Sequence, residues 1–156
     1  ITIDLNGKTI NYNSTTQGEA MITNNGDLTI NDTVGTGKIT LEATNNRGWN
    51  AYSSVISNTV GGKLTVNGGT IEHLGGTDMA YGVDNLTNGK GTYAEVIING
   101  GVIKSPYRAI RQFLNSATAE NVLTINGGVV EGANKAIFFH DPSTKANSGK
   151  LVVGEN

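Results

Sequence analysis

One short phrase recurs along the chain, and it limits the folds open to this sequence more than any other feature. It reads Leu-Thr-Val-Asn-Gly-Gly at 64–69, Val-Ile-Ile-Asn-Gly-Gly at 96–101 and Leu-Thr-Ile-Asn-Gly-Gly at 123–128. Looser copies begin at positions 3, 28 and 151, so the copies lie about 25 to 36 residues apart, a spacing typical of solenoids and other stacked arrays. Because the spacing is uneven, it favours a solenoid with loops of different length over a propeller of equal blades.

A second phrase recurs in step with the first, and a third apolar position follows each turn. The second phrase occupies 21–24, 55–58, 82–85, 109–112 and 136–139. The third position is filled by Ile10, Ile39, Ile71, Ile103 and Val130. Each repeat thus holds three short β-rich segments and no stretch of helical period. This pattern predicts an all-β fold, a right-handed parallel β-helix of about five coils with three short strands per coil. The alternative is an antiparallel meander, because Asn-Gly is also a hairpin signal.

Stacked coils would turn these sequence positions into columns whose members lie about 4.7–4.9 Å apart. We expect two buried apolar columns and an outward column that favours β-branched residues. The buried columns are Leu28, Leu64, Val96, Leu123 and Leu151, and Ile30, Val66, Ile98, Ile125 and Val153; the outward column is Asp4, Thr29, Thr65, Ile97, Thr124 and Val152. We also expect two ladders of side-chain amides bonded from coil to coil. They are Asn6, Asn31, Asn67, Asn99 and Asn126, and Asn24, Asn58, Asn85 and Gln112.

The chain is predicted to form a single β-helix domain over residues 1–156, because no Pro-rich or charged linker divides it. It has 22 glycines and only 15% charged residues, but its periodic Val, Ile and Leu argue against disorder or collagen. It begins with Ile1 and stops within what reads as a sixth coil. We therefore expect a fragment of a longer protein, with neighbouring sequence or another chain covering its last coil.

Several classes of partner and cofactor are disfavoured. A net charge of −2 without a cluster of Lys and Arg gives no electrostatic case for nucleic acid. The absence of cysteine excludes disulfides and thiolate metal sites, and no apolar run is long enough for membrane insertion. His73 and His140 share no metal-ligand spacing, so we expect surface or turn roles for them, no metal and no cofactor.

The sequence offers no convincing pair of catalytic carboxylates. Hydrolysis of a glycosidic bond needs two carboxyl groups about 5–10 Å apart. The column after the Gly-Gly turn reads Asn11, Thr40, Glu72, Lys104 and Glu131, so its acids alternate with a lysine as in a surface charge ladder. Asp84 and Arg111 share another outward column, where we expect a cross-strand ion pair worth about 0.2–1 kcal/mol. No catalytic residue is predicted.

Binding a sugar does not need the paired carboxylates that cleaving one needs, because aromatic rings stack on sugar faces while amides and hydroxyls form hydrogen bonds to the rim of the sugar. Trp49 and Tyr52 lie in an insertion that makes their repeat the longest, and long loops on regular scaffolds often carry function. Tyr81 lies one coil further on, and Tyr107, Arg108 and Arg111 form the one local cluster of two arginines with an aromatic residue. We predict these six as glycan-binding residues. The alternatives are a packing role for Trp49 and ordinary surface charge for the arginines.

The Leu-Thr-Ile-Asn-Gly-Gly-x-Ile phrase, with Asp-Leu-Asn-Gly-Lys-Thr-Ile at 4–10, resembles the pectin-lyase-like right-handed β-helices of bacterial surface proteins and of bacteriophage tailspikes and fibres. The resemblance covers nearly the whole chain but concerns the fold, and fold does not fix function. It implies an extracellular or virion setting and a polysaccharide partner. No catalytic signature of the enzymatic members has a counterpart here.

We therefore expect a non-enzymatic β-helical shaft or binding module of a phage tail-fibre or tailspike-like receptor-binding protein, contacting bacterial surface polysaccharide. The outward Ile97, Phe138 and Val152 favour a homotrimer or another fibre-like homo-oligomer. One alternative is a segment of a bacterial cell-surface adhesin. The other is a glycan depolymerase whose acids lie partly outside this chain.

Overall fold

The structure, a computed structural model, describes residues 1–15, 18–43, 52–76, 78–90, 92–116, 118–140 and 148–154. These residues form sixteen β-strands and no helix. Successive strands are assigned in rotation to three sheets, which we call A, B and C. Sheet A holds β1 (Thr2–Asp4), β4 (Asp27–Asn31), β7 (Lys63–Val66), β10 (Tyr93–Ile98), β13 (Glu120–Ile125) and β16 (Ser148–Val153). Sheet B holds β2 (Thr9–Ser14), β5 (Lys38–Ala43), β8 (Thr70–His73), β11 (Val102–Ser105) and β14 (Val129–Gly132). Sheet C holds β3 (Ala20–Asn24), β6 (Ser53–Asn58), β9 (Ala80–Thr87), β12 (Arg108–Leu114) and β15 (Lys135–His140).

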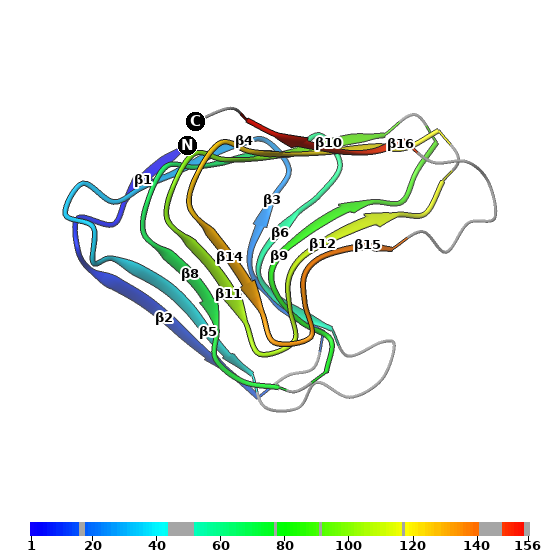
Figure 1. Ribbon diagram of the computed structural model, residues 1–156. Coiled ribbons are helices and arrows are strands. Elements are labelled where there is room, and N and C mark those ends of the chain that lie inside the picture. Colours follow the sequence, from blue (N-terminus) through cyan, green and yellow to red (C-terminus); the bar gives the residue numbers. More distant parts are fainter. Residues whose placement is uncertain are drawn as a thin grey trace.

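Each strand pairs in parallel with the strand three places along the chain, which is the topology of a parallel β-solenoid. Five coils of three strands are followed by one further strand, β16. Figure 1 looks along the stack, with each coil passing through all three sheets. The predicted parallel solenoid with three strands per coil is confirmed, and the antiparallel meander is wrong.

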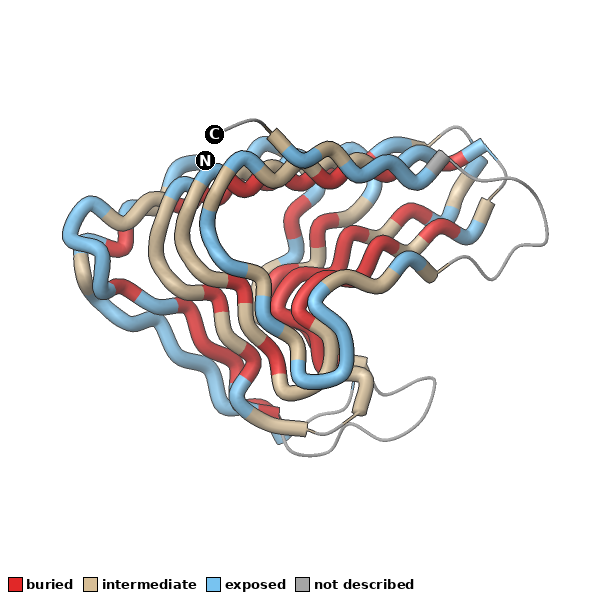
Figure 2. Tube along the Cα trace, in the orientation of Figure 1, coloured by how far each residue is buried: buried red, intermediate tan, exposed pale blue. Residues whose placement is uncertain are grey.

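The predicted apolar columns form the core except at their last members, because Leu151 and Val153, predicted as buried, are exposed on the last coil. Leu64, Val96 and Leu123 share one register position in sheet A, and all three are fully buried. In sheet B, the column after the turn places Ile39, Ile71 and Ile103 on top of one another, also without exposure. Figure 2 shows the buried residues along the strands of the middle coils, with mostly exposed residues in the first and last coils. Alternation along each strand therefore separates a dry interior from a wet surface.

The Asn-Gly-Gly phrase forms the turn from sheet A to sheet B. Its second glycine has a positive φ, +82° at Gly101 and +85° at Gly128. A Cβ on Gly128 would lie 2.6 Å from the carbonyl oxygen of Gly101 in the coil below. The turn repeats so faithfully because its backbone conformation and its close stacking both require glycine.

The asparagines of this turn form the first ladder, which is bonded through Asn31, Asn67, Asn99 and Asn126. The Nδ2 groups of Asn67, Asn99 and Asn126 each donate to the Oδ1 of the asparagine in the preceding coil at 2.8 Å. The prediction that Asn6 begins this ladder is wrong, because Asp4 lies opposite Asn31 in the register and Asn6 follows two residues later. The Asp4 carboxylate closes the first turn by accepting the backbone N–H of Asn6 at 3.0 Å. Thr2, rather than Asp4, shares the outward column with Thr29.

The second ladder lies in the interior, where sheet C turns back to sheet A. The Nδ2 groups of Asn24, Asn58 and Asn85 donate to the next coil at 2.7, 2.8 and 2.8 Å, ending on Gln112. They therefore point toward the C-terminal end, opposite to the first ladder. Asn58 Nδ2 also meets the carbonyls of Gly62 and Glu95, which fixes its orientation. The next coil carries Phe139 at this position, so the buried Nε2 of Gln112 has no partner among the described residues.

Sheet C differs from the other sheets by a bend. In each of its strands the paired positions skip one residue, so that two successive residues face inward. Val55 and Ile56 are both core residues, as are Ala109 and Ile110. The skip is a local kink in the pleat, and it makes the outer face of the sheet concave (Figure 1).

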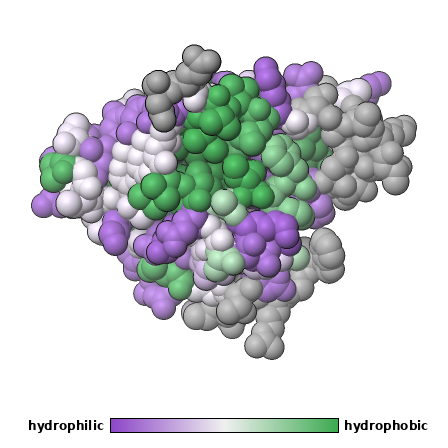
Figure 3. Space-filling view, in the orientation of Figure 1, coloured by the Kyte–Doolittle hydropathy of each residue, from purple (hydrophilic) through white to green (hydrophobic). Residues whose placement is uncertain are grey.

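The last coil exposes a broad apolar face. Its exposed apolar residues are Val129, Phe139, Leu151 and Val153. Figure 3 shows this end of the stack as a continuous apolar surface bordered by polar groups. Ile97 and Val152, on the outer face of sheet A, are less exposed than the residues of the last coil. Both are half-buried, and their neighbours in the column include threonines.

Candidate functional site

A cavity of about 680 Å³ lies on the outer face of sheet C. Its walls come from β9, β12 and β15 and from the segments that precede β6 and β9. Three rows of outward-facing residues run across the strands of this face, one before the bend in chain order and two after it. The rows are Tyr81, Arg108 and Lys135; Asp84, Arg111 and Phe138; and Leu86, Phe113 and His140. The bend therefore directs residues of three neighbouring coils into one hollow.

A buried ion pair lies at the base of this face. Arg111 donates from Nε to Asp84 Oδ1 at 2.7 Å and from Nη2 to Oδ2 at 2.5 Å. Asp84 is fully buried and Arg111 is only 5% exposed. Burial acts to lower the pKa of the guanidinium, but the charge and hydrogen bonds of Asp84 outweigh it and raise the pKa of Arg111 above its ordinary value. The pairing of the two residues was predicted correctly, but the expectation of a surface pair was wrong.

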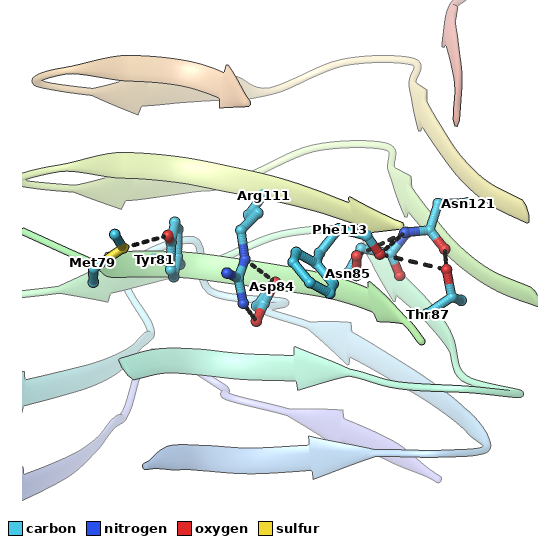
Figure 4. Close-up of polar contacts among 8 residues, drawn as sticks. All are labelled: Met79, Tyr81, Asp84, Asn85, Thr87, Arg111, Phe113 and Asn121. Atoms are coloured by element: carbon cyan, nitrogen blue, oxygen red, sulfur yellow. Dashed lines mark hydrogen bonds and ion pairs between the residues drawn. The ribbon is translucent and has the colours of Figure 1, made fainter. Parts of the chain in front are cut away.

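Aromatic rings from three coils enclose this ion pair. The Arg111 Cζ lies 4.8 Å from the ring centroid of Tyr52, 4.5 Å from that of Tyr81 and 4.8 Å from that of Phe113. The Tyr81 hydroxyl donates to Met79 Sδ at 3.3 Å, as Figure 4 shows beside the ion pair. Burial raises the pKa of Tyr81, and nearby Arg111 partly opposes the shift. The rings replace the water that a guanidinium otherwise keeps.

Arg108 occupies a different setting at the edge of the same cavity. Its Cζ lies 4.3 Å from the Tyr107 ring centroid and 3.7 Å from the Phe138 centroid. Arg108 is half-buried, and its Nε makes a long contact of 3.5 Å with Asn134 Oδ1. Phe138, predicted as bare apolar surface, is therefore partly covered by a guanidinium.

Four of the six predicted glycan-binding residues line the cavity: Tyr52, Tyr107, Arg108 and Arg111. The prediction for Tyr81 is wrong, because its side chain is fully buried and packs against Arg111 and Tyr107 instead of lining the cavity. Trp49 lies outside the described residues. Three residues that the sequence reasoning missed also lie here, namely Phe113, Phe138 and His140, whose rings contact one another at 5.0 and 5.2 Å. Their signal was present, since Phe138 shares the column of Arg111 and Phe113 is two residues further along the same strand.

The polar part of the lining contains few carboxylates. Asp78, Asn88 and Asn115 contribute to the rim. Among the described residues that line the cavity, Asp78 is the single carboxylate, because Asp84 is held below by Arg111. The site thus offers amides, hydroxyls, rings and one guanidinium edge to a ligand.

The charge column of sheet B has the register predicted for it. Glu72, Lys104 and Glu131 lie opposite one another in successive strands, and Lys104 Nζ lies 3.6 Å from Glu131 Oε1. These residues line a smaller cavity of about 290 Å³ on another sheet. The lysine between the two acids gives the column the character of a surface charge ladder.

The expectation of a surface position for His73 was wrong, because this side chain is buried, with 1% exposure, although it does contact the turn that follows its strand. Its Nδ1 accepts the backbone N–H of Gly75 at 3.3 Å, so Nε2 carries the proton and donates to Ser53 Oγ at 2.6 Å. Burial lowers the pKa of His73 to about 4. Within the described ranges, no group of three or more His, Asp and Glu residues is arranged to hold a metal ion.

Comparisons with known proteins leave the chain without an assigned relative. No family model, no curated protein and no solved structure matches it. A search of the described residues for a helix with the length and apolar character needed to cross a membrane finds none.

Proposed function

We propose that the chain is a non-enzymatic glycan-binding module, and that the sheet C cavity is its binding site. The observation that carries this proposal is that four residues, chosen from the sequence for their sugar-binding chemistry, line one cavity. Its volume of about 680 Å³ falls within the ~300–1,000 Å³ typical of small-ligand sites. Aromatic edges beside amide and hydroxyl groups are the chemistry by which proteins bind sugars.

The setting that we propose is a phage tail-fibre or tailspike-like receptor-binding protein at the virion surface, in contact with bacterial surface polysaccharide. A rigid solenoid suits this role because strands hold binding groups more firmly than loops do. The resemblance of the repeated turn to such proteins supports the proposal. An adhesin segment of a bacterial cell surface would use the same site in the same way.

The direct test is to screen the chain against bacterial polysaccharides while assaying for released oligosaccharide. Binding without release is expected. Tyr107→Ala and Phe113→Ala should weaken binding about fivefold or more, since each removes an aromatic surface worth about 1 kcal/mol or more. Tyr93→Ala is the matched control, because Tyr93 is an exposed tyrosine on sheet A.

The same screen covers Trp49, for which the sequence predicts that Trp49→Ala abolishes most binding with little loss of fold. Glu72→Gln and Glu131→Gln should leave binding intact, since both acids belong to the sheet B charge column. Release of oligosaccharide that disappears in either Gln variant, together with unchanged binding in Tyr107→Ala, would replace the binding module with a depolymerase.

A further inference from the structure

The two arginines of the sheet C cavity differ in what they can still bind. Arg111 directs Nε and Nη2 at both carboxylate oxygens of Asp84 and is almost fully buried. Its charge is compensated within the protein. Arg108 forms no ion pair with any carboxylate of the described residues, and its one hydrogen bond to them is the long contact with Asn134. Its Nη1 and Nη2 are therefore available to a ligand.

The Arg108 guanidinium is also held in a fixed plane. Tyr107 and Phe138 lie over it at 4.3 and 3.7 Å, and stacked rings restrict a long side chain that otherwise has many rotamers. A planar fork fixed in this way matches a carboxylate, which accepts two parallel N–H bonds. Little conformational entropy remains to be lost on binding.

The surrounding charge favours an anion at this edge. Lys135 follows Arg108 in the register of sheet C, and its Nζ lies 6.0 Å from the centroid of the same Phe138 ring. Asp78 is the opposing charge on the cavity wall, but it forms no ion pair with Arg108. A second positive side chain thus lies near the Phe138 ring that Arg108 contacts, although Lys135 does not itself line the cavity.

We infer that the ligand of the sheet C cavity is an acidic glycan, and that Arg108 binds the carboxylate of one of its sugars. This inference rests on the proposed function, and it names the class of glycan. Arg108 is then the residue that determines specificity, whereas Arg111, paired with Asp84, contacts the separate group of rings formed by Tyr52, Tyr81 and Phe113.

The test uses an array on which glycans containing uronic or sialic acid stand beside their carboxyl-reduced forms. For the glycan that binds best, carboxyl reduction should weaken binding about ten- to a hundredfold, the value of a charge-assisted hydrogen bond. Arg108→Gln should cause a similar loss with the acid and little further loss with its reduced form. Arg108→Lys should restore part of the binding, and rising salt should weaken binding of the acid alone.

Lys104→Gln supplies the matched control, because it removes a half-exposed cation on sheet B, away from this cavity. The affinity of the Lys104→Gln variant for the acidic glycan should equal that of the unmodified protein. Equal binding of an acid and its reduced form, or unchanged binding in Arg108→Gln, would overturn the inference. If neutral glycans bind and Tyr107→Ala abolishes that binding, the proposed function stands and this inference fails. If no glycan binds, both fail.

Discussion

At the scale of single residues, Asp84 and Arg111 meet where neither charge has much contact with water. When one partner of such a pair is removed, the other charge stays buried without compensation, at a cost of about 3–5 kcal/mol. We expect Asp84→Asn to lower the free energy of unfolding by this amount. Urea denaturation followed by circular dichroism measures the loss.

Two further variants make this measurement specific. Glu95→Gln breaks the more exposed pair between Lys63 and Glu95, 3.3 Å apart, and should cost less than about 1 kcal/mol. Asp84→Leu combined with Arg111→Met removes both charges and should recover most of the lost stability. If Asp84→Asn proves as stable as Glu95→Gln, the buried pair does not have the structural role that its geometry indicates.

His73 should make stability depend on pH. Its pKa is about 4 in the folded protein and about 6.5 when unfolded, so the unfolded chain binds the proton more readily between these values. Stability should therefore fall as pH drops from about 6.5 to 4, by about 3 kcal/mol. In His73→Gln this contribution disappears, which unfolding free energies measured at pH 7, 5.5 and 4.5 would reveal as a shallower slope. An unchanged slope would contradict the assignment.

The pairing of Asp84 with Arg111 could be predicted from the sequence, but the burial of the pair could not. The two residues lie 27 positions apart in one column, and the repeat places them opposite each other. Their burial depends on Tyr52, Tyr81 and Phe113, which come from different coils and close over the pair only after the coils have stacked. Burial of a surface column is a property of packing, which a single repeat does not encode.

At the scale of structural elements, the two amide ladders should differ in their contribution to stability. Asn58 is fully buried and bonds two carbonyl groups and two neighbouring amides, so Asn58→Leu leaves several buried polar groups unpaired. We expect a loss of about 3 kcal/mol or more. Asn99 lies in an exposed turn where water can replace its partners, so Asn99→Leu should cost less than about 1 kcal/mol.

Thermal and urea denaturation of the two variants would test this contrast, with Thr124→Ser as a control on the outward column of sheet A. Equal losses at Asn58 and Asn99 would mean that burial does not set the strength of a ladder.

The elements themselves were predictable wherever the Asn-Gly-Gly phrase fixed the register. The first coil differs from the prediction because Asp4, a carboxylate, occupies the ladder position opposite Asn31, and Asn6 lies two residues further along the chain. The bend of sheet C was not foreseen, although pairs such as Val55 and Ile56 mark it as two apolar residues in succession. Alternation alone would have placed one of each pair outside, and the skipped position that turns both inward appears only when strands are paired.

At the scale of the whole molecule, the proposed association of copies of the chain into a homotrimer can be tested by measuring its mass in solution. The proposed homotrimer would associate through the outer face of sheet A, where Ile97 and Val152 interrupt a row of threonines. We expect a trimeric mass by light scattering and a monomeric mass for Ile97→Lys. Lysine would place a charge in an interface that should be apolar.

Association through the apolar end of the stack would give a different result. Val153, which is 70% exposed there, lies on the last coil rather than on the side of the solenoid. Val153→Lys should leave a trimer intact if the copies lie side by side. Dissociation in Val153→Lys with no change in Ile97→Lys would place the contact at the end of the stack, and a monomeric mass at all concentrations would contradict the trimer.

The opposite directions of the two amide ladders have a consequence for how many coils such a stack can contain. Each hydrogen-bonded amide carries a dipole, and dipoles aligned in series build partial charges at the ends of a column, as in a helix. The amides of the ladder from Asn31 to Asn126 are aligned one way along the stack, and those from Asn24 to Gln112 the other way. The two moments largely cancel, and parallel columns of opposite polarity attract each other. A stack of this kind can therefore be lengthened coil by coil without accumulating electrostatic potential at its ends.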